Sequence, residues 1–396
     1  MPVRPIGSTR VILSLFLILF LGTADNQVLS PLLPSIRTDL GRASYEMGFL
    51  FSVYSLVAGL SVLLWGPISD AFGRKSCLIA GLLLFSAGSV TSLSARTFFA
   101  LLTGRAITGL GASMLSLNSL SFAADFFPYS ARGWAMGSIL SSYFAALILG
   151  VPIGSLVGDR LGWNAVFGLV ACAGLCLMVT AWILLPNLGE RTKARIPRIA
   201  ILQGSGNYLN YLKARRTFGS IAGGFFASAG TMGFLAFLGV WLHDDFGISA
   251  RQTGLVFLAS GAAAFIASPF AGSLSDRIGK RTQFIGSSIF LAILLLLLPH
   301  MKWGIPLFGL FFSISLTAAF RQGPLEALLS EVVPASQRGS FLALKNSFSQ
   351  LGIGLASILS GLLFEWSGYG AVCLLCSAAN VAAVAAVFWA VRGQKL

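Results

Sequence analysis

The chain is poor in charged residues, and acidic residues are the scarcest of them. Only 10% of its 396 residues are charged, with 13 acidic against 27 basic side chains, whereas a soluble domain carries about 25%. Together with 56% hydrophobic residues and a mean hydropathy of +0.84, this scarcity excludes a soluble enzyme. The basic residues cluster between long apolar stretches, so the net charge of +14 does not describe a surface for nucleic acid.

Residues that build catalytic or metal centres are also scarce. The two histidines, His243 and His300, lie at the ends of apolar segments, and the five cysteines lie within or beside such segments. Cys373 and Cys376 spell C-x-x-C, which we interpret as packing because no His or acidic partner is nearby. The sequence also lacks a G-x-x-x-x-G-K-[ST] segment for ATP phosphates. We therefore expect no enzymatic activity, no metal and no cofactor.

What the chain has instead is a series of long apolar segments. Most reach the ~20 residues that a transmembrane helix needs. The first of them carries Asp25, exceeds a signal-peptide core in length and has no small-residue cleavage site, so we expect it to remain in the mature protein. The sequence predicts an all-α membrane protein with twelve transmembrane helices, in the segments 11–36, 47–69, 76–95, 106–124, 133–158, 161–189, 217–243, 252–275, 282–301, 303–330, 340–364 and 366–391.

The distribution of basic residues predicts the orientation. With both termini in the cytoplasm, 18 Lys and Arg residues fall on the cytoplasmic side and 6 on the opposite side. This bias follows the positive-inside rule. We expect a multi-pass protein of a bacterial cytoplasmic (inner) membrane with both termini inside.

The chain divides into two similar halves. The longest polar stretch, 187–216, separates a bundle of six helices at 1–186 from a second at 217–396. Residues 207–216 could form an amphipathic interfacial helix, with Tyr and Leu facing lipid, or a solvated linker. The halves repeat at an offset of 206, so that Asp70, for example, recurs as Asp276. Such a repeat places both halves in one membrane orientation, related by an axis along the membrane normal, with a substrate site between them.

Three motifs carry a resemblance to a known family. The sequences GPISDAFGRK at 66–75 and GSLSDRIGKR at 272–281 resemble the signature loop of the major facilitator superfamily. LTGRAITGLGA at 102–112 resembles the fourth-helix motif of its proton-coupled drug antiporters, the arabinose-efflux-permease-like branch. Gly150, Pro152, Gly154 and Gly158 are similar to the antiporter motif, although that pattern has adjacent Gly-Pro and paired glycines where this chain reads G-V-P-I-G-S. The resemblance implies the major facilitator fold and favours antiport.

The signature loops are candidate gates. Their glycines allow a tight reversal and close helix approach. We expect Asp70 to cap a helix or to pair with Arg132, and Asp125 to hold Arg74, so that these charges latch the cytoplasmic side in the outward-facing state. Solvated positive-inside loops are the alternative. The full gating set is Gly66, Asp70, Gly73, Arg74, Asp125, Arg132, Gly150, Pro152, Asp276, Lys280, Glu331 and Arg338.

Positions that differ between the halves are candidates for coupling. Asp25 is the one acidic residue of its segment and corresponds to Thr231 in the second half. An ionised carboxylate near mid-membrane is costly, so its protonation should depend on which side of the cavity is open. Arg105 lies at a similar depth and requires a partner, and we expect it to pair with Asp25 directly or through water. The alternative is that Arg105 only braces the fourth helix through backbone carbonyls and that Asp25 caps a break in the first helix.

Polar residues on the cavity-lining helices are the substrate candidates. In the second half, Glu326 and Lys345 form either a structural ion pair, or a substrate contact or second protonation site. Arg321 is the candidate ligand for an anionic substrate. The complete set is Asn26, Tyr54, Asn118, Tyr143, Arg321, Gln322, Glu326, Lys345, Asn346 and Gln350.

These observations favour proton-coupled efflux of small amphipathic organic compounds by alternating access. A spinster-like lipid or lysolipid carrier is an alternative, although that group has Glu where this chain has Ala112. A metabolite importer and a transporter-like receptor also stay open. The expected partners are an amphipathic small molecule, protons (with Na⁺ left open) and the lipid bilayer, with the chain acting as a monomer and without nucleic acid.

Overall fold

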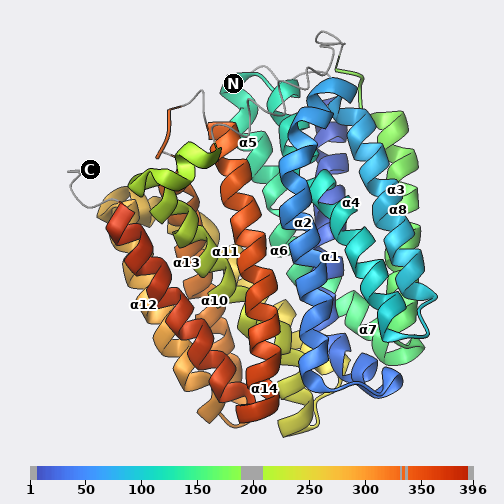
Figure 1. Cartoon of the computed structure of the whole chain (residues 1–396), viewed down its shortest axis with the longest axis vertical. Helices are drawn as coiled ribbons and strands as arrows, with labels where there is room; N and C mark the ends of the chain where they lie inside the picture. The colour runs from blue at the N-terminus through green and yellow to red at the C-terminus, as the bar shows by residue number, and fades with distance from the viewer. Residues whose placement is uncertain (1–6, 189–207, 331, 335–337, 391–396) are drawn as a thin grey trace.

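The computed structural model describes residues 7–188, 208–330, 332–334 and 338–390, and the described chain is built from helices (Figure 1). Apolar composition and the absence of long polar breaks within each segment explain why the chain forms long helices. The elements are α1 (Ser8–Leu40), α2 (Ser44–Phe72), α3 (Arg74–Leu93), α4 (Phe98–Phe126), α5 (Tyr129–Leu140), α6 (Ser142–Ala145), the π-helical η1 (Ala146–Gly150), α7 (Val151–Leu161), α8 (Trp163–Leu184), α10 (Arg215–Phe246), α11 (Ala250–Ile278), α12 (Lys280–Leu297), the 3₁₀-helical η2 (Leu298–His300), α13 (Ile305–Ser330) and α14 (Arg338–Ala390).

The longest element, α14, contains a reversal at Gly368. Its φ of 72° and ψ of −174° lie outside the helical region, in a conformation that glycine adopts without steric cost. Ala356, before the glycine, and Cys376, after it, both pack against Gly233 of α10. The chain therefore crosses twice in α14. Eleven described helices are long and apolar enough to span a membrane, and with the reversal they give the twelve crossings that the sequence predicts.

The fifth crossing is broken into four consecutive pieces, α5, α6, η1 and α7. Its π-helical turn, Ala146–Gly150, lies directly before the Val-Pro of the antiporter-like segment. Single π-helical turns are uncommon in proteins. Where they occur, they often lie at functional sites. The break therefore marks the crossing where the sequence predicts a gate.

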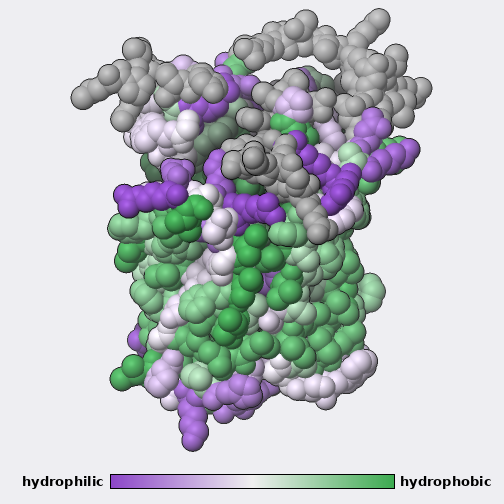
Figure 2. Space-filling model, turned by 90° about the vertical axis from the view of Figure 1, so that its left-hand side faces the viewer, coloured by the Kyte–Doolittle hydropathy of each residue, from purple (hydrophilic) through white to green (hydrophobic). Residues whose placement is uncertain are grey.

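The molecule has a hydrophobic belt between two polar ends. Figure 2 shows the belt on one side of the molecule, with hydrophilic residues gathered at both ends. We name the end where α1 begins and α14 finishes the terminal face, and the opposite end the far face. Tyr211, in the helical turn at 208–213 on the terminal face, is 6% exposed and packs against Phe341 of α14. Its ring therefore faces protein, and the expectation that Tyr side chains of 207–216 contact lipid is wrong at this position.

Small residues bring α3 and α4 into close contact inside the first half. A Cβ at Gly88 would lie 2.5 Å from the backbone nitrogen of Thr108 and 2.8 Å from the carbonyl oxygen of Gly104. Glycine at such positions allows the backbones of membrane helices to approach closely. Because Gly104 directly precedes Arg105, this contact also sets the position of that arginine.

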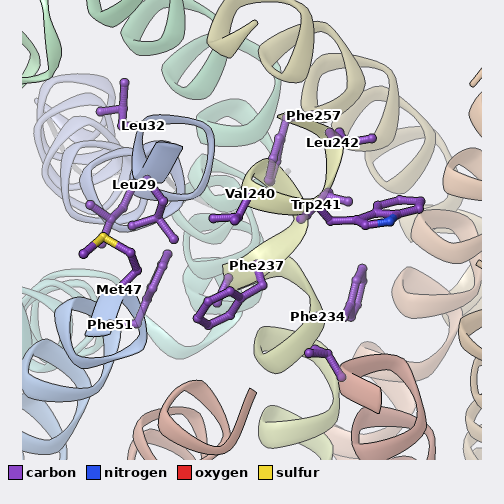
Figure 3. Packing of buried hydrophobic residues seen from close by; sticks show 14 of the residues in the cluster. Leu29, Leu32, Met47, Phe51, Phe234, Phe237, Val240, Trp241, Leu242 and Phe257 are labelled. Carbon is purple, nitrogen blue, oxygen red and sulfur yellow. The ribbon is translucent and has the colours of Figure 1, made fainter. Parts of the chain in front are cut away.

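The two halves meet at the far face through an apolar cluster. Leu29 of α1 and Met47 and Phe51 of α2 are at most 4% exposed, as are Phe237 and Val240 of α10. Figure 3 shows Phe237 and Val240 directed toward the side chains of α1 and α2. Residues about two hundred positions apart thus share one core, which closes the far face in this conformation.

Two polar contacts accompany this cluster. Ser30 Oγ donates to the carbonyl oxygen of Leu235 at 2.6 Å and accepts from the backbone N–H of Gly239 at 3.2 Å. At the far end of the same helices, Arg37 binds Asp244 through two hydrogen bonds of 2.7 Å. Bidentate arginine–carboxylate pairs are specific in geometry. The pair therefore fixes the register of α1 against α10.

The halves separate toward the terminal face between α5 and α11. The two crossings are in close contact near the far face, where a Cβ at Gly254 would lie 2.9 Å from Ser155 Cβ. Nearer the terminal face they enclose a cleft of about 430 Å³. Its lining is almost entirely apolar and comprises Gly137, Leu140, Ser141, Phe144, Phe265, Ile266, Ser268 and Pro269.

Gly88→Ala should destabilise the protein, because the added methyl group meets backbone atoms of α4 that have no room to move. We expect the free energy of unfolding to fall by about 1–3 kcal/mol, the usual cost of overpacking. Thermal unfolding of purified protein in detergent measures the effect. Gly309→Ala on α13 is the control, because a Cβ there has nothing within 4 Å. Equal midpoints for the two variants would contradict the close contact.

Reversing one charge of the Arg37–Asp244 pair should open the far face. Arg37→Asp or Asp244→Arg replaces attraction by repulsion across the halves, and a half-exposed pair is worth about 1 kcal/mol, which is roughly fivefold in population. Spin-label distances between Asp159 of α7 and Arg251 of α11, each replaced by labelled cysteine, should lengthen in the single variants. The charge-swapped double variant should restore the wild-type distance. A double variant as open as the singles would show that the pair does not hold the halves together.

Candidate functional site

A buried ion pair lies between α1 and α4. Arg105 Nη1 donates to Asp25 Oδ2 at 2.7 Å, and both side chains are 0% exposed. The matched depths of the two residues predict a pair, directly or through water, and the structure has the direct one. An ionised pair without water requires both groups to be bonded closely, because the cost of desolvation is otherwise several kcal/mol for each ion.

The bonding of this pair is incomplete. Asp25 Oδ1 has no hydrogen-bond partner among the described residues, and neither do Nε and Nη2 of Arg105. Aromatic rings cover the guanidinium instead, with the Arg105 Cζ 4.7 Å from the ring centre of Tyr54 and 5.9 Å from that of Phe167. Cation–π contacts of this kind stabilise a desolvated guanidinium. One carboxylate oxygen of the pair thus has no partner in the part of the chain that the structure describes.

A row of glycines brings α7 and η1 against α1 beside Asp25. A Cβ at Gly150 would lie 2.5 Å from Ala24 Cβ, and one at Gly154 would lie 2.5 Å from Val28 Cγ2. Gly158 continues the row one turn further. The segment also has a second face, because Pro152 lies instead against Gly254 of α11 in the second half. The antiporter-like segment therefore contacts the helix of Asp25 on one face and the opposite half on another.

The second half contains a different buried cation. Arg321 of α13 is 1% exposed and donates to Asn380 Oδ1 of α14, to Thr231 Oγ1 and to the carbonyl oxygen of Ala227, both of α10. No carboxylate among the described residues pairs with it, and its Nε has no partner among them. Arg321 is enclosed in its own half by neutral acceptors. The expectation that it faces a substrate cavity is wrong for this conformation.

A second charge pair lies at the half-exposed surface of α13 and α14. Lys345 Nζ binds both carboxylate oxygens of Glu326, at 2.8 and 2.9 Å. The Lys345 side chain is 4% exposed and that of Glu326 is 44% exposed. Gln322 and Asn346 are exposed on the same two helices. The structure brings these four substrate candidates together near the terminal face.

The remaining substrate candidates divide by exposure. Tyr143 of α6 is 39% exposed, and Asn26 of α1 is half-buried. Gln350 is half-buried against Gly59 of α2. Tyr54 is 6% exposed beneath Arg105, so its contact is with the coupling pair.

The structure corrects the assignment of Asn118 to the substrate candidates. It is 0% exposed, its Nδ2 donates to the carbonyl oxygen of Met114 at 2.7 Å, and its Oδ1 accepts from Ser69. Because both amide atoms are bonded within the first half, the residue connects α2 to α4 and does not face a cavity. Helix contacts of this type are a common use of buried amides in membranes.

The first signature loop forms a bonded network around Arg74. Its Nε lies 3.2 Å from Asp125 Oδ2, its Nη1 lies 2.7 Å from Ser69 Oγ, and its Nη2 lies 2.5 Å from Asp70 Oδ1. The pairing of Arg74 with Asp125 is as expected. The pairing of Asp70 with Arg132 is wrong, because Asp70 is bound four residues away by Arg74, across the turn at Gly73 with φ of 89°. The bonds join α2, α3 and α4 of one half.

The other gate candidates are placed as follows. Gly66 lies in α2, and a Cβ added there would have nothing within 4 Å, so the expected close helix approach is wrong at this position. Asp276 is exposed near the end of α11, and Lys280 begins α12 after Gly279, whose φ of 87° matches that of Gly73. Arg338 begins α14. Glu331 lies outside the described residues.

Two groups of functional interest were missed by the sequence analysis. No role is assigned there to Arg37 or to its partner Asp244, although both stand near the ends of equivalent helices. Asn380, which binds Arg321, lies in an apolar run and gives no signal other than its amide. Among the described residues no group of three or more His, Cys, Asp or Glu is arranged to bind a metal ion.

The comparisons with known proteins agree on one family. The family model "Major Facilitator Superfamily" matches residues 15–243 and 220–395. The chain is 30% identical over 376 residues to "Uncharacterized MFS-type transporter YwfA" of Bacillus subtilis, covering 93% of this chain and 89% of that protein. It is 23% identical over 389 residues to "Multidrug resistance protein D" of Escherichia coli, covering 93% of this chain and 92% of that protein.

A further relative and a solved structure extend this comparison. "Chloramphenicol resistance protein" of Streptomyces lividans is 28% identical over 65% of this chain and 64% of that protein. The crystal structure of the human organic anion transporter MFSD10 (TETRAN) superposes with a TM-score of 0.69 at 20% identity, covering 96% of this chain and 99% of that chain. That likeness shows the fold. With twelve crossings in two similar halves and a family match along nearly its whole length, the chain belongs to the Major Facilitator Superfamily of transporters.

Proposed function

We propose that this transporter exports small amphipathic organic compounds in exchange for protons, by alternating access between its two halves. The observation that carries the proposal is the sealed Asp25–Arg105 pair with one unbonded carboxylate oxygen. A carboxylate in a dry membrane interior is costly when ionised and unpaired, so a proton and Arg105 compete to neutralise it. Competition of this kind is what a proton-coupled carrier requires.

The proposed orientation places the terminal face in the cytoplasm of a bacterial cell, because 18 of the Lys and Arg residues then lie inside against 6 outside. The far face, closed here by the apolar cluster and the Arg37–Asp244 pair, is then periplasmic. The conformation corresponds to a carrier that has its periplasmic side shut. The chain is proposed to work as a monomer, with its site between its own two halves.

The proposed cycle uses protonation to release the Asp25–Arg105 bond. When the far face opens, a periplasmic proton neutralises Asp25, and the attraction that holds α1 to α4 weakens. Because α1 also carries Ser30 and Arg37, which bind α10, a change in α1 is transmitted to the contact between the halves. Loss of the proton to the cytoplasm restores the pair and resets the carrier.

Drug export is supported by the names of relatives. "Multidrug resistance protein D" and "Chloramphenicol resistance protein" name resistance for those proteins, at 23% and 28% identity. The apolar lining of the cleft between α5 and α11 suits a substrate with an apolar body. Its 430 Å³ lies within the range of about 300–1,000 Å³ that small-molecule sites occupy.

A lipid or lysolipid carrier is the second candidate, and one feature of the cleft favours it. Ile266 and Ser268, two residues apart and so ~200° apart around α11, both line the cleft. The cleft therefore reaches two faces of the helix, as a passage for an acyl chain from the hydrophobic belt would. Transport of a lysolipid without proton movement would select this candidate.

Asp25→Asn should abolish proton-linked transport, because Asn keeps the shape and one acceptor for Arg105 but cannot exchange a proton. In proteoliposomes with an imposed pH gradient, substrate-dependent proton movement should fall by at least about tenfold, as expected for loss of an intramembrane proton carrier. Asp159→Asn, at the exposed end of α7, is the matched control and should transport as wild type.

The assay should be scanned with cationic, neutral and anionic amphiphiles to find a substrate. Proton movement that persists in Asp25→Asn would contradict the coupling role. A Na⁺ gradient that replaces the proton gradient in wild type would assign the same carboxylate to Na⁺.

A further inference from the structure

A groove lies between α11 and α13 in the part of α11 that approaches the terminal face. It has a volume of about 490 Å³ and is lined by Phe270, Ser273, Leu274 and Arg277 of α11 and by Phe320 of α13. Its walls are mostly apolar, and Phe270 is 63% exposed and Leu274 37% exposed. An exposed apolar hollow on a membrane-crossing helix is a place where an apolar ligand gains contact area.

The spacing of residues on α11 produces the hollow. Phe270, Ser273 and Arg277 follow one another at intervals of three and four residues, so they share one face of the helix. Ser273 is the small residue between two large ones, and its hydroxyl donates back to the carbonyl oxygen of Phe270 at 3.1 Å. Of the described residues that line the groove, Arg277 therefore supplies the charge, and it lies at the end nearest the terminal face.

The guanidinium of Arg277 is exposed and has no carboxylate partner in the described part of the chain. The adjacent Asp276 is about 100° away around the helix and does not line the groove. Arg281, one turn further on, has its Cζ 4.7 Å from the ring centre of Phe388. Arg277 is thus open to an anion from outside the protein.

The two walls of the groove are tied together by a side chain of α12. Gln283 is 4% exposed, and its Nε2 donates to the carbonyl oxygen of Ala271 on α11 at 2.9 Å and to that of Phe320 on α13 at 3.0 Å. These bonds hold α11 and α13 in one arrangement. A ligand that enters the groove consequently meets a site that is already formed, which lowers the cost of ordering on binding.

The repeat of the two halves does not require this arrangement. At the offset of 206, Pro67 and Ala71 occupy the positions of Ser273 and Arg277. The first half therefore has neither the small polar residue nor the cation on this face of its second crossing. Arg277 is a feature of the second half alone, and the shared arrangement of helices does not explain it.

We propose that this groove binds an anionic phospholipid of the leaflet next to the terminal face, with its phosphate on Arg277 and an acyl chain along Phe270 and Phe320. The planar guanidinium of arginine matches the oxygens of a phosphate in geometry. Three basic residues and one acidic residue at 276–281 favour a head group with net negative charge. In the proposed orientation this leaflet is cytoplasmic, where basic pockets between transmembrane helices suit anionic lipid heads.

The bound lipid is a resident of the second half and not the transported compound. Every described residue that lines the groove belongs to α11 or α13, whereas alternating access moves a substrate held between the two halves. The lipid therefore stays with its half while the halves move. The inference goes beyond the proposed function and does not depend on which compound is exported or on proton coupling.

The test is native mass spectrometry of purified full-length protein in detergent, titrated with dioleoyl phosphatidylglycerol or dioleoyl phosphatidylcholine. The two lipids share their acyl chains and phosphate and differ in net charge. Wild type should bind the phosphatidylglycerol more tightly, and Arg277→Gln should weaken that binding on the order of tenfold through loss of charge-assisted hydrogen bonds. Arg216→Gln is the matched control, because Arg216 is an exposed arginine of α10 at the same face, and it should bind as wild type.

A second variant tests the groove itself. Ser273→Leu fills the hollow and keeps Arg277, so it should weaken the binding of both lipids. Ser273 is exposed, and a leucine there stays in apolar surroundings, so the fold should tolerate it. Phosphatidylglycerol should also raise the thermal unfolding midpoint of wild type, since a ligand stabilises the state that binds it, and should raise that of Arg277→Gln less. Glycerol phosphate, which has the head without the chains, should not displace the lipid.

Equal affinity of wild type for the two lipids would overturn the proposal. An equal loss of phosphatidylglycerol binding in Arg216→Gln and Arg277→Gln would also overturn it, because the attraction would then come from the general charge of the terminal face. Unchanged lipid binding in Ser273→Leu would place the lipid elsewhere. Displacement by glycerol phosphate would reduce the site to one for a free phosphate and overturn the assignment to a lipid.

Discussion

The structure of the first half depends on keeping one ion pair in a dry interior. Arg105 and Asp25 are completely buried, and removing either would leave an uncompensated charge among hydrocarbon. The surrounding features serve this pair. Glycines place α4 against α3 and α7 against α1, and the ring of Tyr54 covers the guanidinium. Three polar atoms of the pair nevertheless have no hydrogen-bond partner among the described residues.

The two halves repeat the same arrangement of helices but differ in the charged residues that they bury. Where the first half has Asp25, the second has Thr231, and its buried cation Arg321 is bonded by neutral groups of α10 and α14. Hydrogen bonds from a guanidinium to neutral acceptors do not depend on pH in the physiological range, because arginine stays protonated. The second half therefore contains a fixed charge and, at Glu326, an exposed one.

The contact between the halves is uneven from one face to the other. At the far face, apolar residues such as Phe237 and Phe51 are sealed together and α1 is tied to α10 by Ser30 and Arg37. Toward the terminal face, α5 and α11 part at the level of the broken fifth crossing and Pro269. Helix irregularities on both sides of the cleft give these crossings a place to bend, since π-helical turns and prolines interrupt the regular hydrogen-bond ladder.

The sequence by itself determined the twelve crossings and the repeat, and it indicated that Asp25 and Arg105 lie at similar depths, because segment length, charge position and depth along a helix can all be counted. It could not determine where Asn118 and Arg321 point, or that Asp70 binds Arg74 and not Arg132. Those outcomes depend on the rotation of each helix about its axis, which is fixed by packing against residues distant in sequence. The Arg37–Asp244 pair, 207 positions apart, exists only because two helices of different halves meet, and only the tertiary structure decides that.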